Sequence, residues 1–276
     1  MTLELAQYKV TKSNALINAS YKLTLNEQRL VLACIAQIDS RRFSMVAHPD
    51  SGPAREVMFD QLWKIKVTAA DFAKTFNINP RDAYDELKAA TKDLYERTIR
   101  TTSIRKNRQG VAVKTVTEKR WIISRSYEDG SGFAEITFNP EIAVYLTMLR
   151  EQFTTYTLHQ VASFRSIYTI RLFELLIQYR KTGYLLKGLD DLIDLFQLSY
   201  TRYADVRRCV IEPAVKELAA KSNLIVTWKP IKTGKPVTHI EFTFKENPQS
   251  RLAFGDEEDA PAPAIKKPAR RKAAVS

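Results

Sequence analysis

The chain has 276 residues, enough for two domains of ordinary size, and its content of 45% apolar and 10% aromatic residues is typical of a folded protein. Its net charge is +12, of which the last 26 residues contribute only about +2, with six basic and four acidic side chains. Positive charge on the body of a protein favours a nucleic-acid-binding surface. No long amphipathic helix with one basic face is present, which disfavours an anionic membrane as the partner.

The two cysteines, Cys34 and Cys209, lie in apolar helical patterns far apart in the sequence. We expect both to be buried free thiols, which fits a reducing cytoplasm. Residues 1–4 lack the basic and apolar regions of a signal peptide, and every apolar run is too short to span a membrane. We therefore expect a cytoplasmic protein, and we expect no cofactor or metal because no zinc-ligand spacing is present.

The first predicted helix begins at Thr24, because Thr24 and Glu27 have the spacing of a capping box. Leu30, Cys34 and Ile38 then recur every four residues and give this helix one apolar face. Residues 40–56 contain several turn-forming residues and are predicted to be a loop.

A second capping box, from Thr68 to Asp71, opens a short helix that is predicted to end at Phe76. Residues 77–79 form a turn, and Pro80 takes the first position of a longer helix, where a proline is tolerated. A short helix, a three-residue turn and a longer helix with one polar face are the pattern of a helix-turn-helix.

Residues 97–125 are the most basic stretch of the chain, with nine Lys or Arg and a single acid, Glu118. The apolar residues of this stretch are β-branched or aromatic, which predicts a β-ribbon with a basic tip at residues 106–110. We interpret the ribbon as the wing of the first helix-turn-helix, closed by a strand at 136–138. The alternative is a solvated, lysine-rich hairpin without a partner.

The second half of the chain repeats this pattern after a predicted linking helix at 141–156. A helix at 163–180 precedes a short helix at 189–198, and a longer helix follows at 203–221. The hairpin after it has a basic loop at 229–235. The sequence therefore predicts an α+β fold with two tandem winged-helix domains, each a helix-turn-helix plus a β-hairpin wing.

We expect three parts along the chain. An N-terminal winged-helix domain spans residues 1–140, and a C-terminal winged-helix domain spans residues 141–246. Residues 247–276 form a flexible charged tail with too few apolar groups to pack. This tail either contacts phosphate or only keeps the protein in solution.

Several stretches carry a family resemblance: residues 16–19, 23–30, 163–176, 189–192, 210–218 and 231–235. The most specific are Val-Ile-Glu-Pro-Ala-Val-Lys-Glu-Leu at 210–218 and Ile-Lys-Thr-Gly-Lys at 231–235. These stretches resemble the iteron-binding replication initiators of theta-replicating plasmids over roughly residues 8–245. The family carries a proline where this chain has Pro213, although Leu218-Ala219 and Lys235 depart from its common residues.

The resemblance implies a mechanism. Monomers of such initiators bind direct repeats of double-stranded origin DNA, help to open an AT-rich segment and recruit host replication proteins such as the initiator and the helicase, as well as chaperones. Homodimers formed through the N-terminal domain bind an inverted repeat and repress the gene of the initiator itself. The C-terminal domain makes the main base contacts.

Candidate DNA-binding residues of the second unit follow from position. The start of a recognition helix faces base edges, and an Arg there can bind guanine with two hydrogen bonds. Wing lysines are expected to contact the backbone. The alternative for Arg207 is a salt bridge to Asp205 or to a neighbouring helix. The candidates are Thr201, Arg202, Tyr203, Arg207 and Arg208 for bases, Lys216 for phosphate, and Lys229, Lys232 and Lys235 on the wing.

In the first unit, Asp82 and Asp85 near the start of the recognition helix weaken the case for DNA contact by that helix. The basic ribbon is the surer contact. The candidates are Arg81 and Lys88 on the recognition helix, Lys74 on the helix before it, and Arg105, Lys106 and Arg108 on the ribbon.

Enzyme motifs are absent, and we expect no catalytic residue. The three histidines are isolated from one another, so the metal-binding pair of a DNA-nicking initiator is missing. Residues 183–188 have the glycine spacing of a P-loop, but Leu189-Asp190 replaces the required Lys-Ser/Thr, so we predict a helix end and a short strand. Asp190, Asp191 and Asp194 fit the N-terminus and solvated face of a helix better than a metal site. The alternative function is a winged-helix transcriptional repressor that does not initiate replication.

Overall fold

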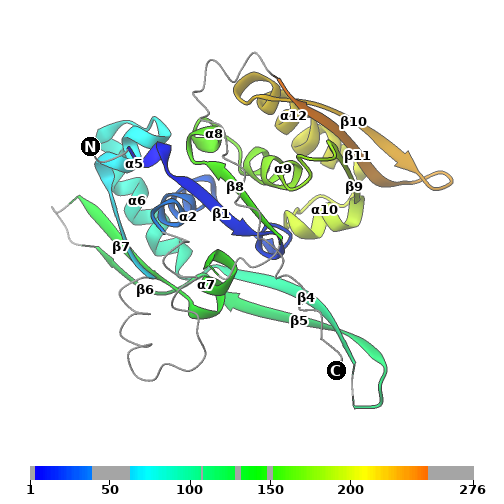
Figure 1. Cartoon of the computed structure of the whole chain (residues 1–276), viewed down its shortest axis with the longest axis horizontal. Helices are drawn as coiled ribbons and strands as arrows, with labels where there is room; N and C mark the ends of the chain where they lie inside the picture. The colour runs from blue at the N-terminus through cyan, green and yellow to red at the C-terminus, as the bar shows by residue number, and fades with distance from the viewer. Residues whose placement is uncertain (1–3, 39–62, 107, 128–131, 148–151, 248–276) are drawn as a thin grey trace, which may run out of the picture.

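A computed structural model describes residues 4–38, 63–106, 108–127, 132–147 and 152–247 (Figure 1). The predicted loop at 40–56 and the tail from residue 248 onward lie outside the described residues. The helices are η1 (Leu5–Gln7), α1 (Asn14–Ile17), α2 (Leu25–Gln37), α5 (Ala69–Phe76), α6 (Pro80–Leu94), α7 (Pro140–Thr147), α8 (His159–Ala162), α9 (Ile167–Ile177), α10 (Leu189–Leu195), α11 (Tyr203–Val206), η2 (Arg207–Ile211) and α12 (Glu212–Lys221). The strands are β1 (Lys9–Ser13), β2 (Ser20–Tyr21), β3 (Lys64–Thr68), β4 (Thr98–Lys106), β5 (Ala112–Arg120), β6 (Ile122–Tyr127), β7 (Phe133–Phe138), β8 (Phe153–Thr157), β9 (Tyr184–Gly188), β10 (Leu224–Lys232) and β11 (Val237–Glu246).

The first winged helix consists of α2, β3, α5, α6 and the hairpin of β6 and β7. Its sheet has the order β3-β7-β6. The predicted helix starts are confirmed: Thr24 and Glu27 form a complete capping box, and the Thr68 hydroxyl accepts the amide hydrogen of Asp71. Pro80 occupies the first turn of α6, as predicted. Local hydrogen bonds therefore define the helix-turn-helix, and the apolar faces of its helices pack into the core.

The basic ribbon is not the wing, so that interpretation was wrong. Strands β4 and β5 pair with each other and with β2 in a separate sheet, whereas the wing is the later hairpin of β6 and β7, which pairs with β3. Trp121 separates the two hairpins. Its side chain is fully buried, and its ring meets Tyr21 edge to face at 5.1 Å. Burial of this one aromatic divides residues 97–125 between two sheets.

The second winged helix consists of α9, β9, α10, the helix from α11 to α12 and the hairpin of β10 and β11. The sheet order, β10-β11-β9, matches that of the first unit. Gly183 ends the segment after α9 with a φ of +64°, and a Cβ there would lie 2.6 Å from the carbonyl oxygen of Phe244. The predicted helix end and short strand at 183–188 are thus confirmed.

Pro213 lies inside the long helix at 203–221, as the sequence predicts. The five residues before α12 form a π-helical turn, η2. A π-helical turn shifts the hydrogen-bonding pattern from i→i+4 to i→i+5. Pro213 therefore takes a position near the start of α12, where its missing amide hydrogen costs little.

The predicted linking helix at 141–156 is only half correct. Helix α7 ends at Thr147, and residues 153–157 form strand β8, which pairs antiparallel with β1. The segment of Phe153, Thr154, Thr155, Tyr156 and Thr157 alternates between exposed and buried side chains, as a strand does. A partner strand 144 residues earlier in the chain decides this structure.

Polar groups join the two winged helices around α9. Arg171 is buried and donates hydrogen bonds to the carbonyl oxygens of Ile17, Ala19 and Tyr21 in the first unit. Asp194 of α10 forms an ion pair with Arg100 at the base of β4 and accepts a hydrogen bond from Ser20. A single hydrophobic core runs through both units. Asp194 remains exposed, so the expectation that it lies on the solvated face of its helix is confirmed, and from there it pairs with Arg100.

Candidate nucleic-acid interface

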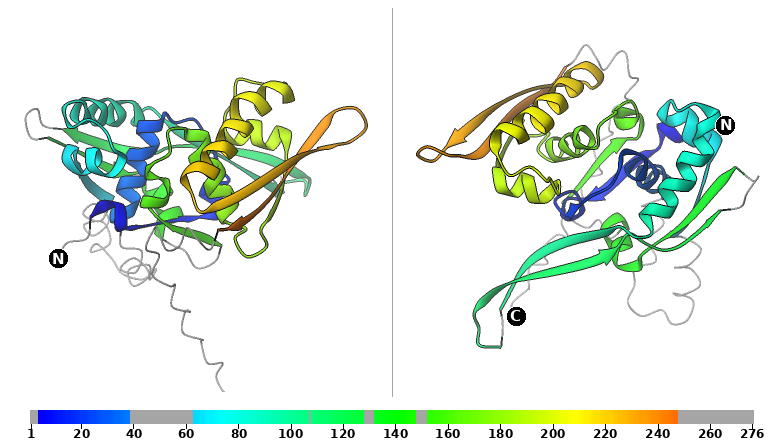
Figure 2. Two further views of the ribbon diagram at one scale, coloured as in Figure 1. Left: turned by 90° about the horizontal axis from the view of Figure 1, so that it is seen from above. Right: turned by 180° about the vertical axis from the view of Figure 1, so that it is seen from behind.

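Both recognition helices, α6 and the helix from α11 to α12, lie on the same face of the molecule, toward the viewer in the right-hand view of Figure 2. The view from above agrees, because both lie on one side of the body there. The wing of β10 and β11 projects beyond the body from this arrangement.

The start of the second recognition helix is open to solvent. Thr201 and Arg202 are exposed, and Tyr203 is half-buried. Arg202 occupies the N-cap position of α11 without a capping hydrogen bond. Within the described residues no carboxylate pairs with Arg202, so its guanidinium is available to a ligand.

Arg207 and Arg208 are exposed, but both already have partners. Nε of Arg207 lies 2.7 Å from Oε1 of Glu212, and this hydrogen bond raises the pKa of Arg207 above its ordinary value. Nη2 of Arg208 lies 3.3 Å from Oδ1 of Asp205. The π-helical turn places residues five apart on one side, which explains the pairing of Arg207 with Glu212 rather than with Asp205. DNA contact by either arginine requires exchange of these exposed ion pairs, which are weak.

The basic residues of the second wing lie in different surroundings. Lys232 and Lys235 are exposed near its end, and no acidic partner is found for them within the described residues. Lys229 pairs with Glu241 at 2.8 Å. Lys216 is exposed on α12. The tip lysines therefore offer more uncompensated charge than Lys229 does.

In the first unit, Arg81 is exposed in the first turn of α6, beside Asp82 and Asp85. Lys88 lies further along α6, with its Nζ 4.7 Å from the ring centroid of Tyr127 on β6. Lys74 instead pairs with Glu4 at 2.6 Å. The structure thus brings Lys88 to the wing and directs Lys74 elsewhere.

Two candidate residues of the first wing, Arg125 and Tyr127, which both lie on β6, were not identified from the sequence. Arg125 of β6 lies over the rings of Tyr95 and Tyr127, at 5.6 Å and 5.8 Å. Together with Lys88 they form a surface of cations and aromatic rings beside the recognition helix. The sequence did contain a signal for this hairpin. Serines alternate with larger side chains from Ser124 to Tyr127, as is typical of a strand, and Asp129-Gly130, a pair typical of turns, follows.

Lys106 is the last residue of β4, Arg108 lies between β4 and β5, and both are exposed. The hairpin of β4 and β5 projects from the body, away from α6 and α12 (Figure 1). The side chain of Arg105 lies outside the described part of the structure. These candidates therefore belong to a separate projection of the molecule rather than to a wing.

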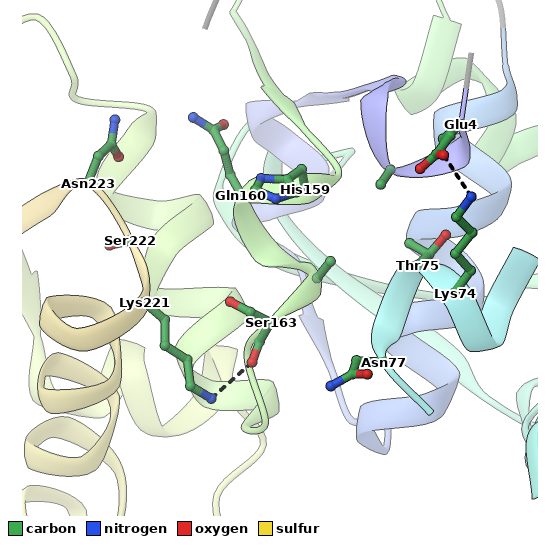
Figure 3. A pocket seen from close by; sticks show the side chains of 12 residues that line it. Glu4, Lys74, Thr75, Asn77, His159, Gln160, Ser163, Lys221, Ser222 and Asn223 are labelled. Carbon is green, nitrogen blue, oxygen red and sulfur yellow. Dashed lines mark hydrogen bonds and ion pairs between the residues drawn. The ribbon is translucent and has the colours of Figure 1, made fainter. Parts of the chain in front are cut away.

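A pocket of about 380 Å³ lies between the two units (Figure 3). Lys74 and Glu4 line one side, and Lys221 lines the other, where its Nζ donates to the carbonyl oxygen of Ser163 at 2.9 Å. Its charged groups are thus already satisfied. Among the described residues there is no group of three or more His, Cys, Asp or Glu side chains suited to a metal ion. Of the described helices, none is long and apolar enough to cross a membrane.

Two recognition helices on one face, each next to a β-hairpin wing, define a tandem winged-helix protein. Two family models match the chain: "Initiator Replication protein, WH1" over residues 9–177 and "Initiator Rep protein, WH2" over residues 188–244. They cover most of its length, and the protein belongs to this family of replication initiators.

The chain is similar to two proteins of Escherichia coli. It is 29% identical to an uncharacterized 27.6 kDa protein, over 87% of this chain and 96% of that protein. It is 26% identical to a replication initiation protein, over 90% of this chain and 73% of that protein. Among solved structures, it is similar to the Pi initiator protein in complex with iteron DNA, with a TM-score of 0.58 and 18% identity, over 88% of this chain and 99% of that chain.

Proposed function

We propose that this protein initiates replication of a plasmid by binding direct repeats of duplex DNA at the origin as a monomer. The match of both winged-helix family models to one chain carries this proposal. It is supported by the positive charge of the body and by the two recognition helices on one face. The iteron DNA bound by the structurally similar Pi initiator suggests the kind of DNA site.

The two domains would make different contacts with the DNA. In this proposal the C-terminal domain, residues 141–246, makes the main base contacts through Arg202, Arg207 and Arg208, with phosphate contacts from Lys216, Lys232 and Lys235. The N-terminal domain, residues 1–140, makes accessory contacts through Arg81 and Lys88 and mediates dimerisation. The dimer would bind an inverted repeat and repress the protein's own gene.

The bound array would help to open the origin and recruit host replication proteins in a bacterial cytoplasm. Opening needs no chemistry from this chain, because deformation of the duplex can be driven by binding energy. The protein is therefore proposed to act as a DNA-binding scaffold and not as an enzyme.

The first test is selection of bound duplexes from a random DNA pool at moderate salt. We expect an extended, asymmetric motif of about two helical turns, because two winged helices would lie along one site. Binding without an enriched motif would overturn the proposal in favour of a protein that reads only the DNA backbone.

The second test places the gene and its flanking DNA on a replicon without another origin. Maintenance that depends on the intact gene and on direct repeats of the selected motif supports initiation. A single palindromic motif, with repression but no maintenance, would instead identify a winged-helix repressor.

A further inference from the structure

The hairpin of β4 and β5, here called the arm, projects from the body on the same side as the wing of β10 and β11 (Figures 1 and 2). Only its base is held in a wider sheet, because β2 pairs with β4 at Ile99 and Arg100 alone. Beyond Arg100 the described arm is a two-stranded ribbon. The six residues from Thr101 to Lys106 extend about 20 Å, which is longer than the ~12 Å width of a DNA major groove.

Positive charge is compensated at the base of the arm and uncompensated toward its tip. Each cation near the base has a carboxylate partner in the structure: Arg97 with Glu27, Arg100 with Asp194, Lys119 with Glu141, and Arg120 with Glu96. Toward the tip, Lys106, Arg108 and Lys114 are exposed, and the described residues provide no acidic partner for them. The outer half of the arm therefore presents net positive charge.

One face of the arm combines this charge with apolar groups. Residues opposite each other in an antiparallel pair share a face, as do residues two apart. Ile104 lies opposite Lys114, and Val116 lies two residues beyond Lys114 on the same face. Ile104 is 79% exposed and Val116 is 51% exposed. A surface that mixes lysines with exposed β-branched side chains has no partner within the described body.

Charge decides between the partners that could cover this face. A second copy of the arm would bring the same unpaired cations together, which is unfavourable. A DNA duplex instead supplies phosphates, and release of its counterions drives binding. A groove accepts a two-stranded β-ribbon, and β-branched side chains can contact thymine methyl groups or base steps there.

We propose that the arm is a third DNA-contacting element, which lies in a groove of the same duplex outside the segment held by the two recognition helices. The proposal rests on the proposed function, since it requires duplex DNA as the ligand. It differs from a wing contact because the arm belongs to another sheet and is anchored to the second unit through Arg100 and Asp194.

The salt dependence of DNA binding tests the proposal. The probe is a labelled duplex of about 40 base pairs, and the measurement is the slope of log affinity against log salt. Lys106→Ser/Lys114→Ser should reduce the slope by about 2, because each phosphate that a lysine neutralises contributes about 0.9. The matched control, Lys181→Ser/Lys245→Ser, removes two exposed lysines of the second unit and should leave the slope unchanged.

The position of the arm on the DNA provides a second, independent test of the proposal. Gln109→Cys in a Cys209→Ser background carries a tethered iron–EDTA group, and the duplex is the one enriched from the random pool. Cuts clustered outside the segment protected by the recognition helices support the proposal. Scattered cuts or none would overturn it.

The outcomes separate the arm from the proposed function. A wild-type protein that binds no duplex would overturn both. Normal wild-type binding with an unchanged slope in the arm variant would overturn only the arm proposal. If that variant instead changed the sedimenting mass of the protein, a second copy of the chain would be the partner of the arm.

Discussion

The Nζ atom of Lys12 lies 2.6 Å from Oε1 of Glu174, and neither side chain has exposed surface. The pair joins β1 to α9 across 162 positions of sequence. Tyr156 of β8 donates a hydrogen bond to the same carboxylate, and burial, followed by the charge of Glu174, raises the pKa of Tyr156 well above its ordinary value. A buried ionic group thus connects the sheet of β1 and β8 to α9 of the second winged helix.

Removal of one partner from this pair should be strongly destabilising. Lys12→Met or Glu174→Leu leaves one buried charge without its counter-charge, and we expect each to lower the free energy of unfolding in urea by about 3–5 kcal/mol. The double variant should lose less than the sum of the two. The control is Lys64→Met, which breaks an exposed pair with Glu135 and should cost less than about 1 kcal/mol. Equal costs for Lys12→Met and Lys64→Met would contradict the buried-pair explanation.

The second recognition helix and its wing should differ in their effect on DNA sequence preference. Arg207→Ala/Arg208→Ala should relax the enriched motif, because these residues lie on the recognition helix, where each arginine bound to a base supplies about 1–3 kcal/mol of discrimination. Lys232→Ala/Lys235→Ala should weaken binding to all sequences alike and flatten the salt dependence. The measurement is affinity for the enriched duplex and for single-base variants of it. Identical behaviour of the two variants would disprove this division.

The two cysteines should differ in reactivity. Cys34 is fully buried, and burial raises the pKa of its thiol far above the ordinary value. Cys209 is half-buried in η2. Because the thiolate is the reactive form, a disulfide reagent at pH 8 should modify one thiol in the native protein and two in denaturant. Cys209→Ser should abolish the native reaction; reaction of Cys34 in the folded variant would contradict its burial.

Acid should weaken the contact between α12 and the segment before α9. Glu217 accepts hydrogen bonds from the Arg165 amide at 2.8 Å and from Lys221 at 2.7 Å. Burial alone raises the pKa of Glu217, but the hydrogen bonds from Lys221 and from the Arg165 amide outweigh burial and lower it. A lowered carboxyl pKa contributes stability above the unfolded value of about 4.3, and this contribution is lost as pH falls through the folded value.

The matching experiment compares wild type with Glu217→Gln in urea from pH 6 to pH 3. The variant should be less stable at pH 6, and the difference should shrink toward pH 3. Lys221→Met removes one of the donors and should show the same trend more weakly. A difference that grows toward acid would contradict the sign of the pKa shift.

The sequence by itself determined the elements that local interactions stabilise. Thr24 with Glu27, Thr68 with Asp71, and Pro80 act within one helical turn, so the first helix-turn-helix could be predicted from local signals. In the second unit, Gly183 marked the end of the helix segment before β9. The family followed from similar short stretches. The exposure of Arg202, Arg207 and Arg208 agrees with their place at the start of a recognition helix, and their contact with DNA stays a prediction.

Only the tertiary structure decided which segments pair over long distances. Trp121 lies between β5 of the arm and β6 of the first wing, and its ring is buried against Tyr21, 100 residues away in sequence. The basic stretch at 97–125 is therefore divided between the arm and the first strand of the wing. Strand β8 exists because β1 pairs with it, and Arg207 meets Glu212 because a π-helical turn precedes Pro213. Strand pairing and side-chain burial depend on partners that no local sequence pattern specifies. For this reason only the tertiary structure identified the arm, the wing with Arg125 and Tyr127, and the buried pair of Lys12 and Glu174.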